Sequence, residues 1–191
     1  MREQDYNDEY DIQLVQQGQT EVFDRVVRRY TPILYSLCYR MLADHERAED
    51  AVQEIFLKAY RSLSTFDPSR RFYSWIYTIA VNHLRSLNRK AVRRPQPDLA
   101  YEDDPREAVR MDGKYDEPDT TAVQREGERL AQEALNRIDR KYREVFVLRT
   151  VEGLSGKEAA EVLGIPENTV KTYLRRAREK MMKEMKKMGW E

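Results

Sequence analysis

Apolar residues recur every three or four positions along two long stretches of this chain, and this spacing constrains the fold more than any other feature. Such spacing gives a helix one buried face. Between the two stretches, residues 93–121 lack the period and contain prolines among clustered acidic residues, so they cannot fold alone. The sequence predicts an all-α fold of two small helical domains, residues 11–92 and 122–191, joined by this extended acidic linker. Residues 1–10 are predicted to be a flexible N-terminus.

Breaks in the period divide the first domain into three predicted helical stretches, over residues 11–42, 46–62 and 71–90. Pro32 is expected to bend the first stretch. Residues 64–71 are predicted to form a loop, because they contain Pro68 and small polar residues. Cys38 and His83 fall on the apolar sides of their helices, and we interpret both as core residues.

The overall charge is balanced, with 34 basic and 34 acidic residues, but its distribution is uneven. Residues 93–127 carry 6 basic and 10 acidic groups, whereas residues 128–191 carry 15 and 11. The single cysteine excludes an internal disulfide, and no apolar run approaches the roughly 20 residues that span a bilayer. No signal-peptide pattern opens the sequence. These features predict a cytoplasmic protein without direct membrane insertion.

A short segment near the C-terminus contains residues typical of helix ends and turns, and it predicts a helix-turn-helix. Ser155 and Glu158 have the spacing of a capping box, in which each side chain satisfies a backbone N–H at the start of a helix. Gly164 can take the left-handed conformation that ends a helix, and Pro166 completes a tight turn. A second helix is expected to begin near Glu167.

The second helix of this motif has an apolar side and a polar, basic side. The apolar residues are Val170, Tyr173, Leu174, Ala177 and Met181. The polar side includes Lys171, Thr172, Arg175 and Arg176. A basic helix of this kind fits the major groove of duplex DNA. The alternative is a surface helix with a charged, solvated face, which we consider less favoured because capping box, turn and basic helix occur in order.

Two surfaces of the first domain are also informative. On the helix over residues 46–62, the outward side combines Asp50, Gln53, Glu54 and the apolar Leu57, which suits either a partner surface or a solvated face with one exposed leucine. From Pro68 to Pro97 there are seven basic residues and no acidic one, with aromatic residues interleaved. This composition favours contact with single-stranded nucleic acid, although an aromatic core beside a solvated basic face would give the same pattern.

Three stretches in order resemble sigma factors of the extracytoplasmic-function group, the small bacterial initiation subunits with regions 2 and 4. They are residues 48–60 (AEDAVQEIFLKAY), residues 72–82 (FYSWIYTIAVN) and residues 153–178, which include Thr169-Val-Lys-Thr. The resemblance covers nearly the whole chain. It implies region 2 over residues 11–92 and region 4 over residues 122–191, in a stress-responsive transcription factor with no catalytic residue, metal or cofactor.

The resemblance also implies roles for individual residues. Core RNA polymerase would bind through its β-prime clamp helices to Asp50, Gln53, Glu54 and Leu57, and through its β flap to region 4. The melted minus-10 element would be captured beside the loop over residues 64–71, by Phe66, Arg70, Arg71, Trp75, Asn82, Arg85 and Arg89. The minus-35 duplex would be bound by Arg149, Lys171, Thr172, Arg175 and Arg176. The acidic linker would run through the nucleic-acid channel of the polymerase, and an anti-sigma factor is an expected partner.

Two other protein classes share parts of this pattern. A repressor or response regulator would bind paired half-sites as a dimer, but it would carry a strand-containing or ligand-binding N-terminal domain, which the sequence lacks. A metal-dependent nuclease would need a ligand cluster. Its candidates, Asp44, Glu46, Glu49 and Asp50, lie at a helix start, where carboxylates are favoured by the helix dipole.

Overall fold

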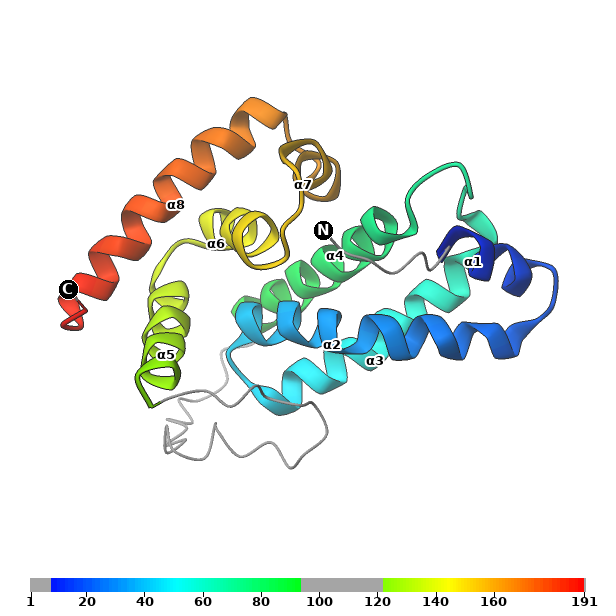
Figure 1. Ribbon diagram of the computed structural model, residues 1–191, viewed down its shortest axis with the longest axis horizontal. Helices are drawn as coiled ribbons and strands as arrows, with labels where there is room; N and C mark the ends of the chain where they lie inside the picture. Colours follow the sequence, from blue (N-terminus) through cyan, green and yellow to red (C-terminus); the bar gives the residue numbers. More distant parts are fainter. Residues whose placement is uncertain (1–7, 94–121, 191) are drawn as a thin grey trace.

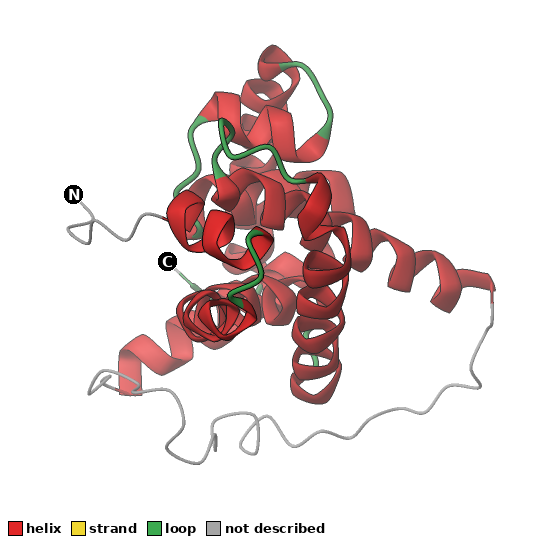
Figure 2. Ribbon diagram, turned by 90° about the vertical axis from the view of Figure 1, so that its right-hand side faces the viewer, coloured by secondary structure: helices red, strands yellow, loops and turns green. Residues whose placement is uncertain are grey.

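The computed structural model describes residues 8–93 and 122–190, and these residues form helices, turns and loops without a strand (Figures 1 and 2). The predicted all-α class is confirmed. The proposed linker, apart from Arg93, lies outside the described residues, as do residues 1–7.

The N-terminal half is a bundle around one apolar core. Its elements are α1 (Asp8–Gln16), the 3-10 turn η1 (Thr20–Val22), α2 (Phe23–Leu42), α3 (His45–Ser62), the 3-10 turn η2 (Leu63–Thr65) and α4 (Phe72–Arg93). Helices α2, α3 and α4 pack against one another. The predicted apolar stripe of α3, which comprises Ala48, Val52, Ile55 and Ala59, is buried.

The predicted first helical stretch is divided in two and starts earlier than expected. Gly18 has φ +101°, a left-handed conformation that separates α1 from α2. Pro32 lies inside α2, which continues past it. The residues of α1 before Asp11 contact the next helix: Asp8 pairs with Arg29 and accepts a hydrogen bond from the Tyr30 hydroxyl at 2.5 Å.

The C-terminal half contains the predicted helix-turn-helix. Its elements are α5 (Ala122–Arg137), α6 (Arg140–Phe146), the π-helical turn η3 (Val147–Val151), α7 (Gly156–Leu163) and α8 (Glu167–Lys187). The capping box is formed, with the Ser155 hydroxyl accepting from the Glu158 N–H at 3.2 Å and the Glu158 carboxylate accepting from the Ser155 N–H at 2.8 Å. Gly164 ends α7 with φ +67°.

The two halves lie against each other, with α4 in the centre of the molecule packed on α7 (Figure 1). Helix α2 contacts α5 and η3. Side chains from the C-terminal half also bind carbonyl groups at the end of α2: Gln132 donates to the Arg40 oxygen at 3.3 Å and Arg143 to the Met41 oxygen at 3.2 Å. These bonds satisfy acceptors that the last turn of a helix leaves without partners of its own.

The Cys38 thiol is buried in this core, as the sequence predicted, and its burial has a consequence for stability at high pH. Burial raises the pKa of Cys38 to about 12, and the charge of Glu152 adds to the shift. In the unfolded chain the pKa is near its ordinary value of 9.0. The free energy of unfolding is therefore expected to fall as the pH rises above 9, because only the unfolded thiol ionises, by about 1.4 kcal/mol at pH 10.

Urea unfolding at pH 8 and pH 10 measures this effect. Wild-type protein should lose about 1.4 kcal/mol more between the two pH values than Cys38→Ala, which lacks the titrating thiol. Equal losses in the two proteins would show that the Cys38 thiol ionises in the folded state as readily as in the unfolded chain.

Candidate nucleic-acid and partner interfaces

The outward face of α3 is exposed as the sequence predicted. Asp50, Gln53 and Glu54 are exposed, and the Leu57 side chain among them is 48% exposed. Tyr60, one turn further along, is 45% exposed, and its ring packs against Phe23 with centroids 5.2 Å apart. Tyr60 was not among the residues predicted for this surface, although its spacing of three from Leu57 places it on the same side of the helix.

One of the carboxylates considered for a nuclease, Asp44, caps the start of α3. Asp44 is the N-cap of the helix, and its carboxylate accepts from the Arg47 N–H at 2.9 Å. Within residues 8–93 and 122–190, no cluster of three or more histidine, cysteine or acidic side chains is arranged to hold a metal ion. None of the helices in these ranges is long and apolar enough to cross a membrane.

The aromatic residues at the start of α4 form a packed cluster rather than an open stacking surface. Phe66 is 3% exposed, and its ring contacts Phe72 and Trp75 at centroid distances of 5.5 and 5.2 Å. Tyr77 is fully buried. Asn82 is exposed, but it lies seven residues beyond Trp75, roughly 10 Å further along the helix. Asn82 therefore lies about two helical turns beyond Trp75, outside the packed aromatic cluster.

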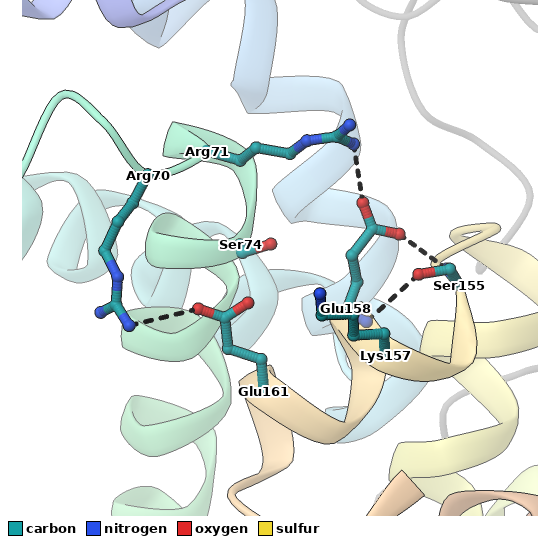
Figure 3. Close-up of a pocket in the computed structure, with 7 residues that line it drawn as sticks. All are labelled: Arg70, Arg71, Ser74, Ser155, Lys157, Glu158 and Glu161. Atoms are coloured by element: carbon teal, nitrogen blue, oxygen red, sulfur yellow. Dashed lines mark hydrogen bonds and ion pairs between the residues drawn. The ribbon is translucent and has the colours of Figure 1, made fainter.

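Three of the arginines assigned to the minus-10 element bind carboxylates of the C-terminal half. Arg71 lies 3.0 Å from the Glu158 carboxylate and Arg70 lies 3.8 Å from that of Glu161, both on α7 (Figure 3). These two arginines are exposed, so each pair contributes little to stability. They border a cavity of about 540 Å³ between the two halves, which is also lined by Ser74, Ser155 and Lys157.

The third arginine makes the stronger contact. Arg85 donates to both carboxylate oxygens of Glu144 on α6, with its shortest distance 2.7 Å, and Glu144 is 5% exposed. A two-point pair of this kind fixes orientation as well as charge. The hydrogen bonds to Glu144 raise the pKa of Arg85. Arg89, one turn further along α4, is exposed.

A second buried carboxylate of the C-terminal half enters the N-terminal core. Glu152 is 6% exposed and accepts hydrogen bonds from the Tyr77 hydroxyl at 2.5 Å and the Ser36 hydroxyl at 3.4 Å. The Tyr73 hydroxyl donates to its backbone oxygen at 3.2 Å. Burial, with the charge of Glu152, raises the pKa of Tyr77, so the phenol remains a donor.

On α8 the predicted division of faces is confirmed. Val170, Leu174, Ala177 and Met181 are buried, and the basic side is exposed over Lys171, Thr172, Arg175 and Arg176. Lys171 and Arg175 pair with carboxylates four residues away, Glu167 at 3.2 Å and Glu179 at 2.6 Å. Such exposed pairs exchange readily for other anions.

Arg149 differs from the α8 residues because its side chain is already engaged. Its guanidinium donates to the Leu154 carbonyl oxygen, which holds the turn between η3 and α7. The side chain is half-buried. No local pattern in the sequence distinguishes this contact from an outward-facing arginine, since the partner is a backbone oxygen.

The Arg85–Glu144 pair predicts that Glu144→Gln loosens the contact between the two halves. The amide keeps the size of the side chain but removes its charge, and hydrogen bonds to charged groups contribute about 1.5 to 3 kcal/mol. We expect a larger radius of gyration by small-angle X-ray scattering. Glu133→Gln is the matched control, because Glu133 pairs with Arg129 and Arg137 within α5. An unchanged radius in Glu144→Gln would contradict the prediction.

Comparison with known proteins identifies both halves. The family model for sigma-70 region 2 matches residues 26–94, and that for sigma-70 region 4 matches residues 128–181. The chain is 36% identical over 183 residues to the ECF RNA polymerase sigma factor SigW of Bacillus subtilis, covering 92% of this chain and 95% of the relative. It is 33% identical to the ECF RNA polymerase sigma-E factor of Haemophilus influenzae, covering 88% and 89%.

A solved structure has the same arrangement of helices. CnrH, in its solved structure in complex with the cytosolic domain of CnrY, superposes with a TM-score of 0.68 at 26% identity, over 92% of this chain and 95% of that one. The chain therefore belongs to the extracytoplasmic-function group of RNA polymerase sigma factors, which are promoter-specific transcription initiation factors without enzymatic activity.

Proposed function

We propose that this factor uses three separate surfaces: α3 for core RNA polymerase, the segment from residue 64 through α4 for the melted minus-10 element, and α8 for the minus-35 duplex. The observation that carries the proposal is the exposure of the α3 and α8 faces on two halves that match regions 2 and 4. In this proposal region 2 extends over residues 11–92 and region 4 over residues 122–191, with residues 93–121 as the linker.

The α3 surface has the composition of a partner interface. Leu57 and Tyr60 offer apolar area in the middle of a polar rim formed by Asp50, Gln53 and Glu54. A central apolar anchor surrounded by polar contacts is typical of interfaces between proteins. We assign the β-prime clamp helices of the polymerase to this surface and the β flap to region 4.

The minus-10 surface is partly covered in this conformation. Arg70, Arg71 and Arg85 bind carboxylates of the C-terminal half, so promoter DNA must replace Glu161, Glu158 and Glu144 as their partners. Trp75, Asn82 and Arg89 complete the proposed surface. Phe66 is buried, so in this proposal it packs against the Trp75 ring and holds it in place rather than touching a base. Capturing an extruded base in a rigid site would couple opening of the duplex to its recognition.

The minus-35 surface is the basic side of α8. Lys171, Arg175 and Arg176 can reach guanine acceptors or phosphates in the major groove, and Thr172 can contact a thymine methyl group. Arg149 is a further proposed phosphate contact, which would require it to share its guanidinium with Leu154. Each half alone would bind DNA weakly, and their linkage through polymerase raises the effective concentration of the second contact.

An anti-sigma factor is also proposed as a partner. The structure of the sigma factor RpoE in complex with the anti-sigma factor NepR from Bartonella quintana has a similar fold, with a TM-score of 0.65 over 86% of this chain. We also propose a cytoplasmic location, because core polymerase and promoter DNA are found there.

The experiment that tests the function adds purified protein to core RNA polymerase and measures transcription from a promoter library. Promoter-specific transcripts that depend on the added factor would support the proposal. A protein that never associates with core polymerase, yet binds operator DNA as a dimer, would instead be a conventional regulator.

Two substitutions should separate the proposed surfaces. Arg176→Ala is expected to weaken binding to minus-35 duplex by about tenfold, because one charged contact is lost, and to leave core association unchanged. Glu54→Lys should do the reverse, since it places a positive charge on the α3 surface. Gel-shift and core-binding titrations measure both effects. Equal loss of both activities in either variant would indicate unfolding and contradict the assignment.

A further inference from the structure

Two side chains of α1 hold the two ends of the segment that links α3 to α4, which lies beside α1 (Figure 1). At the first end, the Gln16 amide donates to the carbonyl oxygens of Leu63 and Phe66, at 2.8 and 3.0 Å. At the second end, the Glu9 carboxylate accepts from the Phe72 N–H at 3.1 Å. Helix α1 precedes the segment matched by the region 2 family model, which begins at residue 26.

The contact at Phe72 completes the start of α4. The first N–H groups of a helix have no partner within it, and a negative charge at this position is favoured by the helix dipole. Residues that cap a helix usually come from the chain immediately before it. Here the acceptor comes from a helix sixty-three residues earlier, so Glu9 ties the start of α4 to α1.

Helix α1 is itself firmly attached to the bundle. Ile12 and Val15 are buried on its inner side. Asp11 pairs with Arg29 at 2.9 Å, and Tyr30 donates to Asp8 at 2.5 Å. Asp8 and Asp11 thus connect α1 to α2, and Glu9 and Gln16 connect it to the loop and to α4.

Between its two anchored ends the loop is held by its own turn. The Asp67 carboxylate accepts from the Ser69 N–H at 2.9 Å, and the Arg70 N–H donates to the Asp67 backbone oxygen at 2.9 Å. The hydrogen bonds from Ser69 lower the pKa of Asp67, which keeps the carboxylate ionised. The position of this turn relative to α4 therefore depends on the bonds at the ends of the loop.

We propose that Glu9 and Gln16 are positioning residues for promoter opening: they fix the loop over residues 64–71 relative to α4, so that it can receive an extruded base. The inference rests on the proposed role of this loop at the minus-10 element. A site that binds an extruded base must be rigid, because a loop that moves gains little from the correct base and loses discrimination. Neither residue touches DNA in this scheme.

The test uses holoenzyme assembled from core polymerase and full-length variants. Glu9→Ala, Gln16→Ala and the double variant are compared for the permanganate reactivity of promoter thymines, for core binding and for minus-35 duplex binding. We expect opening to slow by roughly fivefold to tenfold per variant, the size expected for the loss of one or two hydrogen bonds, with both binding affinities unchanged. Glu9→Gln should recover most of the rate, because its amide oxygen can still accept from Phe72.

The matched control is Gln13→Ala, which removes an exposed glutamine from the same helix and should open promoters like wild type. Wild-type opening rates in the double variant would overturn the inference, as would a parallel loss of core binding, which would mean that α1 serves folding alone. Trp75→Ala separates this failure from failure of the proposed function. If that variant slows opening while the α1 variants do not, the result supports the proposed minus-10 surface and contradicts the positioning role of Glu9 and Gln16.

Discussion

The hydrogen bond from Tyr77 to the Glu152 carboxylate is the contact on which the arrangement of the two halves depends. A carboxylate buried among apolar side chains is costly unless donors surround it. Here hydroxyl groups from both α2 and α4 supply those donors, through Ser36 and Tyr77. Glu152 therefore fixes the end of η3 against both α2 and α4. The pair of Arg85 and Glu144 makes a second contact of this kind between α4 and the C-terminal half.

The three proposed surfaces differ in whether the contact between the two halves covers them. The outer side of α3 and the basic side of α8 face away from the contact between the halves, and their residues are exposed. The start and middle of α4 instead lie in that contact, where arginines that suit phosphate groups are bound to carboxylates. In the proposed scheme, polymerase and duplex DNA would meet surfaces that the other half leaves uncovered, whereas single-stranded DNA would have to displace carboxylates of the C-terminal half.

Much of the fold was predictable from the sequence, because it depends on local chemistry. The period of apolar residues predicted the buried side of α3, and Ser155, Glu158 and Gly164 predicted the limits of α7. The sequence did not reveal which polar face would meet the other half, since an outward face has the same period whether solvent or protein covers it. Arg85 therefore looked like a DNA contact and not like a partner of Glu144.

The least predictable part was the beginning of the chain. Residues 8–10 are polar and lack an apolar period, which favours a frayed end, yet Asp8 and Glu9 bind partners 21 and 63 residues away. Contacts over such distances leave no signal in the local sequence. Phe66 shows the same limitation, because an aromatic residue in a polar loop could equally face a ligand or fill a core.

The π-helical turn at residues 147–151 has a consequence for the register of the C-terminal half. The Glu152 N–H donates to the Val147 oxygen at 2.9 Å, five residues back, so the turn contains one residue more than an α-helical turn. Each residue of an α-helix advances by about 100° around its axis. In a regular α-helix the Val151 N–H would bond to the Val147 oxygen, and Glu152 would lie about 100° further around the axis. The extra residue in the turn instead brings Glu152 over Val147, and from this position its carboxylate reaches the hydroxyl groups of Tyr77 and Ser36.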